Sequence, residues 1–274
     1  MKKYYSAVLA VFKNEAHIIR EWVEHYKNRN IDHIYLLNDF STDNFKEQID
    51  DYIRSGYVTL RDVDSNDVND GITHGRQCAL YNKYFSDVLE ETEWLAVLDL
   101  DEFLYSPKTK DLNEVFMVFD NTNVQELRAE WYHFGSSGLI KQPKRVVENF
   151  IMRNEKFTRD LGLRQQVSGY QTDWCCKTVA KTKFISYICH HYNHFNCFGN
   201  KSFESAGFNL PHFSQNLSDP GTLLINHYLQ SWERYKKRIE LGSCNNNRYI
   251  HRSAALYEIL NRNEIVDTRL RDQG

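Results

Sequence analysis

The first hundred residues alternate between apolar runs and segments with helical periodicity. Residues 4–12, 32–39 and 57–64 are apolar runs of strand length, typical of strands buried on both faces of a sheet. Between them, residues 18–26 and 41–56 repeat apolar side chains every three to four positions, which predicts amphipathic helices. A third helical segment at residues 81–89 leads into a fourth apolar run, "EWLAVLDLDEFL". This order predicts an α/β fold with a mostly parallel sheet and helices on both faces.

The pattern weakens after Pro107. A helix is predicted at residues 111–120, a strand at 124–134 and a helix at 225–242, whereas the region from about 141 to 210 has no clear period. There is no internal repeat and no low-complexity linker. We therefore expect a single domain over residues 1–274, with halves at about 1–106 and 107–242 and a polar tail at 243–274.

Polar clusters follow the predicted strands of the first half. They read "KNE", "NDFSTD", "DVDSND" and "DLDE". In parallel α/β sheets, ligands bind beyond the carboxyl ends of the strands, where all four clusters are expected to lie. This coincidence predicts a binding site at that edge.

The "DLDE" cluster contains a D-x-D pair, Asp99 and Asp101. If the strand continues through them, both carboxylates point to the same side and repel each other unless a positive charge lies between them. A divalent cation would supply that charge, because hard oxygen ligands suit Mg²⁺ or Mn²⁺. The alternative is a pair of solvated acids that cap the next helix.

The composition argues against nucleic acid and a membrane span as partners of the chain. With 34 basic and 37 acidic residues the net formal charge is −3, which lacks the basic excess expected of a nucleic-acid-binding protein. The basic cluster in "SWERYKKRIE" is interpreted as the solvated face of a helix before a phosphate contact. No apolar run approaches the ~20 residues of a membrane span. Six cysteines without a C-x-x-C pair indicate reduced thiols, with a Cys189–Cys197 disulfide as the alternative.

Several motifs occur together in one order: "VFKNEAHIIREWVEHYKNRNIDHIYLLNDFSTD", "WLAVLDLDEFL", "WYHFGSSG", "CKTV" and "NHYLQSW". Over residues of about 5 to 240, this set resembles the family 92 glycosyltransferases, a branch near the family 2 enzymes with the GT-A fold. The resemblance implies an inverting hexosyltransferase that moves a sugar from a nucleotide diphosphate, usually a UDP-sugar, to a glycan or other hydroxyl acceptor. It implies Mn²⁺, or Mg²⁺, held by the D-x-D.

The resemblance also assigns roles to individual residues. Residues 1–106 become the nucleotide-binding half and residues 107–242 the acceptor half. The positions expected at the nucleotide-sugar are Phe12, Asn14, Glu15, Asp39, Arg76, Gln77, Asp99 and Lys177. The metal ligands are expected to be Asp99, Asp101 and one C-terminal histidine, for which we choose His191 from a group that also holds His190, His194 and His227.

Inversion needs a general base, and a carboxylate is the usual choice. The candidates are Asp173 and Glu130, with Asp173 favoured. The aromatic rings expected at the sugar or acceptor are those of Trp131, Phe134 and Trp174, and Gly135 would allow close approach of the backbone. Each aromatic ring has the alternative role of a core side chain.

Two other functions compete with sugar transfer. "VLDLDEFL" also resembles the phosphatases of the haloacid dehalogenase group, in which Asp99 would be the nucleophile, but Phe103 stands where that motif has Thr or Val. The other is a non-catalytic module that binds a sugar or nucleotide. Because the chain lacks the N-terminal membrane helix of the family's animal members, we expect a cytoplasmic protein, perhaps loosely associated with a membrane.

Overall fold

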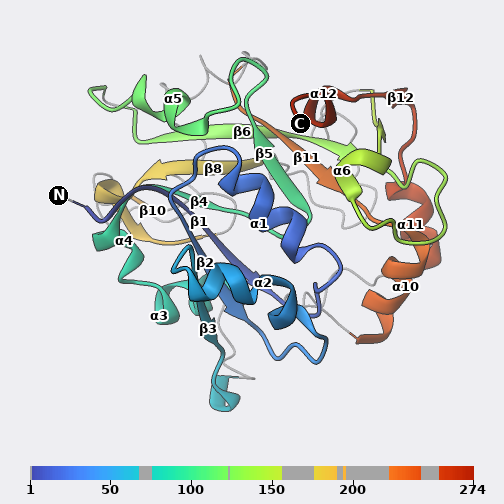
Figure 1. Ribbon diagram of the computed structural model, residues 1–274, viewed down its shortest axis with the longest axis horizontal. Coiled ribbons are helices and arrows are strands. Elements are labelled where there is room, and N and C mark those ends of the chain that lie inside the picture. The colour runs from blue at the N-terminus through green and yellow to red at the C-terminus, as the bar shows by residue number, and fades with distance from the viewer. Residues whose placement is uncertain are drawn as a thin grey trace.

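The computed structural model is built around one large mixed β-sheet (Figure 1). The structure describes residues 2–67, 76–122, 124–155, 176–189, 194–195, 222–241 and 253–274. Its strands are β1 (Tyr4–Phe12), β2 (His33–Asn38), β3 (Val58–Asp62), β4 (Thr92–Val97), β5 (Glu102–Tyr105), β6 (Glu126–Phe134), β7 (Met152–Arg153), β8 (Cys176–Lys181), β9 (Ile185–Tyr187), β10 (His194–Phe195), β11 (Leu224–Tyr228) and β12 (Ile265–Val266). Its α-helices are α1 (Ile19–Lys27), α2 (Phe45–Arg54), α3 (Arg76–Tyr84), α4 (Val88–Glu91), α5 (Leu112–Met117), α6 (Val146–Asn149), α10 (Trp232–Leu241), α11 (Ala254–Leu260) and α12 (Arg269–Asp272).

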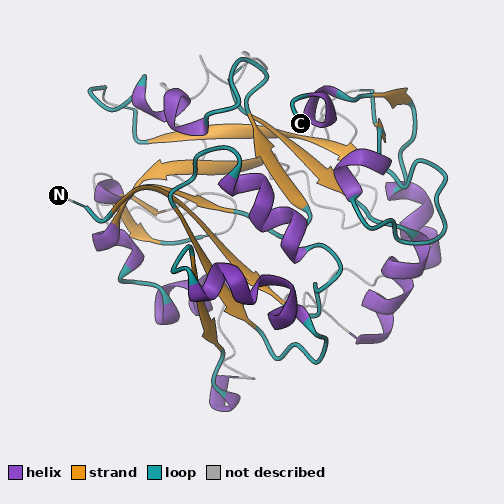
Figure 2. Cartoon of the chain, viewed as in Figure 1, coloured by secondary structure: helices purple, strands orange, loops and turns teal. Residues whose placement is uncertain are grey.

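The first half of the sheet is parallel, as predicted. β2 pairs with β3 and with β1, and β1 pairs with β4, so the carboxyl ends of these strands meet at one edge. Alternate side chains of β1 face opposite layers: Val8 and Ala10 pack with α1 and α2, whereas Leu9 and Val11 pack with α3 and α4. The helices therefore cover both faces of the strands (Figure 2).

The second half of the sheet is mixed. β8 is antiparallel to both β4 and β6, which joins the two halves. β11 runs parallel to β6 and antiparallel to β5. β7 and β12 extend the sheet beyond β6, and β9 pairs with β10 in a separate ribbon. β8 thus borders the parallel half directly through β4, and β11 lies between β5 and β6.

Three predicted elements differ from the observed ones. The helix predicted at residues 225–242 is a strand, β11, followed by α10, whose first turn is capped by the Ser231 hydroxyl as it accepts a hydrogen bond from Arg234 N at 3.2 Å. The helix predicted at 81–89 is divided into α3 and α4. The strand that begins near Glu93 ends at Val97, because Glu102 N donates to Asp99 O at 3.0 Å and turns the chain. The D-x-D pair therefore lies in a turn rather than on one side of a strand.

The predicted polar tail contains regular structure. Residues 253–274 form α11, β12 and α12, and β12 pairs with β7. Near the end of the described chain, Gln273 donates to the carbonyl of Ser106 at 2.8 Å. Of these residues, β12 joins the edge of the sheet.

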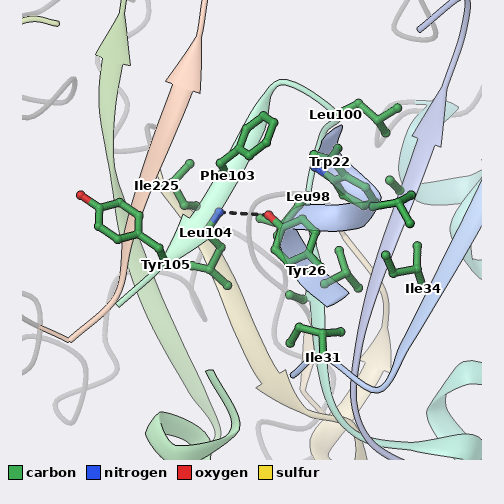
Figure 3. Packing of buried hydrophobic residues seen from close by; sticks show 14 of the residues in the cluster. Trp22, Tyr26, Ile31, Ile34, Leu98, Leu100, Phe103, Leu104, Tyr105 and Ile225 are labelled. Atoms are coloured by element: carbon green, nitrogen blue, oxygen red, sulfur yellow. Dashed lines mark hydrogen bonds between the residues drawn. The ribbon is translucent and has the colours of Figure 1, made fainter. Parts of the chain in front are cut away.

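The apolar face of α1 packs against the segment that carries the D-x-D pair (Figure 3). Trp22 and Tyr26 lie beside Leu98, Leu100 and Leu104. The Tyr26 hydroxyl accepts a hydrogen bond from Leu104 N at 3.0 Å, and this bond is the dashed line in Figure 3. Helix α1 thus fixes the position of the turn and of β5.

Candidate active site

Side chains of helix α1 hydrogen-bond to the backbone of the D-x-D turn. The indole N–H of Trp22 lies between two backbone acceptors, Asp99 O at 3.1 Å and Glu102 O at 3.0 Å. The Tyr26 hydroxyl donates to Glu102 O at 2.9 Å. Buried carbonyl groups need such donors, so the apolar helix also satisfies the polar backbone of the turn.

Asp99 faces a buried lysine. Lys177 Nζ, from β8, lies 2.9 Å from Asp99 Oδ2 and 3.2 Å from Glu102 Oε2. Gln77, at the start of α3, donates to Asp99 Oδ1 at 3.0 Å. Burial favours the neutral amine, but the two carboxylates outweigh it and hold the pKa of Lys177 above its usual range. Burial raises the pKa of Glu102 to about 8, although Lys177 opposes that shift.

Asp101 faces different cations. Arg238 Nη1, from α10, donates to Asp101 Oδ2 at 2.9 Å, and His227 Nε2, from β11, lies 3.6 Å from Asp101 Oδ1. Although burial opposes ionisation, Arg238 and His227 hold the pKa of Asp101 well below its usual range. Each carboxylate of the D-x-D pair therefore has its own cationic partner.

Glu15 extends this cluster to the loop after β1. Its carboxylate lies 3.4 Å from Arg238 and 3.5 Å from Arg234. Burial raises the pKa of Glu15 despite these two arginines. Loops from β1 and β4 and helix α10 thus meet through charged side chains.

Asp39 forms a second polar centre at the end of β2. It is buried, and its two carboxylate oxygens accept hydrogen bonds from Arg76 Nη1 and Nη2, each at 2.6 Å. Paired bonds of this kind hold both side chains in one orientation. Asp39 and Arg76, both predicted site residues, are brought together.

Asn14 joins the loops that follow β1 and β2. It adopts a positive φ of 58°, and its side-chain oxygen accepts from Thr42 N at 2.7 Å and Asp43 N at 3.3 Å. Its own backbone N–H donates to the Ser41 hydroxyl at 2.9 Å. Phe12, by contrast, is buried against Phe45, with ring centroids 4.8 Å apart.

The predicted acceptor residues of β6 take separate positions. Trp131 is buried beside His227, with ring centroids 4.7 Å apart, so it adjoins the Asp101 cluster. Glu130 is also buried, but it alternates with Trp131 and its side chain leaves β6 on the other face. Phe134 is 0% exposed and packs on Tyr228, an arrangement typical of a core side chain.

Gly135 is required by the backbone of the C-terminal segment. Its N–H donates to Arg262 O at 2.9 Å, and a Cβ added to it would lie 2.3 Å from that same oxygen. The next two backbone N–H groups donate to Asn261 and Asn263 side chains, each at 2.8 Å. The close approach that the glycine permits is therefore to residues 261–263.

Three predicted residues lie outside the described residues: Asp173, Trp174 and His191. Sequence reasoning missed Arg234 and Arg238 in the site, because their basic cluster was interpreted first as a solvated face. Lys236 and Lys237 of that cluster are indeed exposed. The i, i+4 spacing of the two arginines was the available signal, since it places them on one face of the helix.

Asp101 and His227 are the described side chains beside the D-x-D turn that could serve as ligands of a divalent cation. Within the described ranges, no group of three or more His, Cys, Asp or Glu side chains is arranged to hold a metal ion by itself. Mg²⁺-type sites at nucleotides commonly use only one or two protein ligands together with phosphate oxygens. His227 Nε2, in β11, lies 3.6 Å from Asp101 Oδ1, in the turn after β4. Among the described histidines, His227 lies next to the D-x-D pair; the choice of His191 stays a prediction, because that residue lies outside the described residues.

The chain belongs to glycosyltransferase family 92, whose sequence profile matches residues 3–252. It is 23% identical over 255 residues to a family 92 glycosyltransferase protein of Oryza sativa subsp. japonica, covering 86% of this chain and 35% of that relative. A second such protein, of Ricinus communis, is 23% identical over 242 residues, covering 86% and 38%. The chain thus spans little more than a third of the length of these curated relatives.

Solved structures offer more distant likenesses. Residues 1–349 of S. aureus TarS match with a TM-score of 0.41 and 13% identity, over 86% of this chain and 64% of that chain. Glucosyl-3-phosphoglycerate synthase from Mycobacterium tuberculosis, crystallised with Mn²⁺, uridine diphosphate and glucosyl-3-phosphoglycerate, matches with a TM-score of 0.36 and 16% identity, over 66% and 58%. Family membership and the mixed α/β sheet confirm the GT-A class of fold predicted from the sequence.

Two further sequence expectations concern cysteines and membranes. Cys78 and Cys189 are buried and form no disulfide, and the hydrogen bond between their thiols, together with burial, raises the pKa of Cys189. Cys197 lies outside the described residues. In the part of the chain that the structure describes, no helix combines the length and the apolar character needed to cross a bilayer.

Proposed function

We propose that this protein is a metal-dependent, inverting glycosyltransferase that moves a hexose from a nucleotide-diphosphate sugar, in the first instance a UDP-sugar, to a hydroxyl acceptor. The observation that carries this proposal is the D-x-D turn at the carboxyl ends of parallel strands, where Asp99 is paired with Lys177 and Asp101 with Arg238. Membership of family 92 supports the same reaction class.

Asp101 and His227 are the residues proposed to hold Mn²⁺ or Mg²⁺, with the oxygens of the donor diphosphate completing the site. When bound, such an ion would act as a Lewis acid that neutralises charge on the departing diphosphate. Lys177 lies beside Asp99, where a fixed ammonium group can stabilise the same developing charge.

The nucleoside is assigned to the edge formed by the loops after β1 and β2. There the buried Asp39 carboxylate, fixed by Arg76, is a rigid acceptor for the hydroxyl or N–H groups of a ribose or base. The Asn14 side chain holds these loops together. Asp39→Ala is expected to weaken UDP binding more than it changes the binding of free Mn²⁺.

Asp173 remains the favoured general base and Glu130 the alternative. The base must reach the acceptor hydroxyl, either directly or through one water molecule. Asp173→Asn should abolish transfer while leaving UDP binding in place, whereas Glu130→Gln should retain transfer because its side chain leaves β6 away from Trp131. The reverse result would exchange the two assignments.

A shallow, open pocket beside the "FGSSG" loop is proposed to bind part of the acceptor. Its volume is about 280 Å³, close to the ~300 Å³ lower bound of small-molecule pockets, which suits one sugar unit. Ser136, Gly138, Ile140, Trp232 and Tyr257 are among its lining residues. An aromatic ring beside polar groups suits a sugar, which has apolar C–H faces and polar hydroxyl edges.

The test is incubation of the purified protein with a panel of UDP-sugars, with Mn²⁺ and with a chelator, while UDP release is measured. Cation-dependent UDP release supports the proposal. Nucleotide binding without turnover would indicate a binding module, and hydrolysis of a chromogenic phosphate ester through Asp99 would indicate the phosphatase alternative. Inversion is tested by the anomeric configuration of the product.

A further inference from the structure

Helix α10 presents two arginines to the site from consecutive turns. Arg234 donates to the carbonyl of Asn14 and lies 3.5 Å from Glu15 Oε2. Arg238 lies 3.4 Å from Glu15 Oε1 and 2.9 Å from Asp101 Oδ2. Of these two arginines, Arg238 is the one that contacts the D-x-D pair.

Asp101 needs a positive partner at all times, because it is only 7% exposed. An ionised carboxylate taken out of water is strongly destabilised unless it is paired. In this structure the partners are Arg238 and, at longer range, His227. A divalent cation would use the same carboxylate and would repel the guanidinium group.

The side chain of Arg238 has room to move away from Asp101. Its side chain is 22% exposed, so it is not enclosed on every side. A guanidinium group binds phosphate oxygens through paired N–H groups, and the donor diphosphate is the anion expected next to the cation. Glu15 stays beside Arg238 and limits how far its side chain can move.

We propose that Arg238 is an exchangeable counter-ion: it neutralises Asp101 until a divalent cation binds there and then donates to the diphosphate of the donor. This inference rests on the proposed function, because it takes that cation and that donor as its ligands. In the free protein Arg238 therefore competes with the cation, whereas in the complex it favours the nucleotide.

The test compares Arg238→Met with Arg234→Met, a matched control one turn away that contacts Glu15 but leaves the Asp101 pair intact. Binding of Mn²⁺ alone is measured by electron paramagnetic resonance of the free ion, and binding of UDP at saturating Mn²⁺ by calorimetry. Hydrogen bonds to charged groups are among the stronger ones in proteins, so Arg238→Met should bind Mn²⁺ roughly tenfold more tightly and UDP roughly tenfold more weakly. Arg234→Met should not bind Mn²⁺ more tightly.

A purely structural ion pair gives a different result. If Arg238→Met, shown by circular dichroism to be folded, binds Mn²⁺ no more tightly than the wild type, the exchange is wrong even though the proposed function stands. If the wild type binds neither Mn²⁺ nor UDP, the proposed function and the exchange both fail. Should Arg238→Met not fold, Arg238→Lys keeps the charge but not the paired N–H groups, and its affinity for UDP should fall while that for Mn²⁺ does not.

Discussion

At the scale of single residues, the site depends on how the charges of two neighbouring acids are neutralised. Asp99 is paired with Lys177 and Asp101 with Arg238, across 78 and 137 positions of sequence. The D-x-D pair itself could be identified from the sequence, because it follows an apolar run. The resemblance named Lys177 as a site residue but not as the partner of Asp99, and Arg238 was missed, because residues so distant along the chain are brought together only by the sheet and by α10.

Replacing Asp101 tests its assigned role. Asp101→Asn keeps the shape of the side chain but removes the charge, so cation-dependent UDP binding should be lost and turnover should fall on the order of 100-fold or more. Both are measured by calorimetry and UDP release. Asp50→Asn, at a surface pair with Arg54, is the control and should retain activity. Full turnover in Asp101→Asn would exclude it as the metal ligand.

At the scale of elements, the parallel half was predictable and the mixed half was less so. β1 to β4 alternate with helices whose periodicity is clear, and their order matches the prediction. β11 was assigned to a helix because its five residues, LINHY, are too few to distinguish the periodicity of a strand from that of a helix. Its true state is decided by the space between β5 and β6, which the sequence does not reveal.

The contact between α1 and the D-x-D turn predicts a defect from a conservative change. Trp22→Phe keeps a buried aromatic ring but removes the N–H that serves the carbonyls of Asp99 and Glu102. Asp99 O keeps the hydrogen bond from Glu102 N and Glu102 O keeps the one from the Tyr26 hydroxyl, so loss of the indole N–H should lower the free energy of unfolding by only about 1 kcal/mol. Denaturant titration measures this loss, and cation-dependent UDP binding should weaken as the turn loosens. An unchanged unfolding midpoint would show that the indole N–H is not needed.

The loop after β6 predicts a contrast between two glycines. Gly135→Ala places a methyl group against Arg262 O and should cost about 3 kcal/mol, at the upper end for overpacking. Gly138 has a φ of 80° but open space around its Cβ position, so Gly138→Ala should cost only about 1 kcal/mol. Denaturant unfolding of both variants gives the comparison. Equal losses would contradict the close approach of residues 261–263.

At the scale of the whole molecule, the C-terminal segment adds the edge strand β12 to the sheet. The family profile ends at residue 252, yet Asp267 of the following segment binds Arg153 Nε at 2.5 Å and Arg269 Nε at 2.9 Å. The sequence indicated only a polar tail there, because the elements of residues 253–274 are too short, at seven, two and four residues, for a periodic pattern to emerge. Their structure comes from long-range ion pairs and from pairing of β12 with β7.

The ion pairs of Asp267 predict how stability depends on pH. Burial alone would raise the pKa of Asp267, but hydrogen bonds from Arg269 and Arg153 lower it to about 2, against roughly 3.9 in an unfolded chain. Its contribution, on the order of 2 kcal/mol, is therefore complete above pH ~4 and is lost as the pH falls towards ~2. Asp267→Asn should be less stable than the wild type at pH 6, and the difference in free energy of unfolding should shrink near pH 2. A difference that stays constant with pH would contradict this account.

The hydrogen bonds of the Asn14 amide have a consequence for the affinity of the proposed nucleoside site. The backbone N–H groups of Thr42 and Asp43 donate to the side-chain oxygen of Asn14 in this structure. A rim that is ordered in advance loses little conformational entropy on association, so more of the contact energy is retained as affinity. The amide protons of Thr42 and Asp43 should accordingly exchange slowly with deuterium even without UDP, and Asn14→Ala should make them exchange fast.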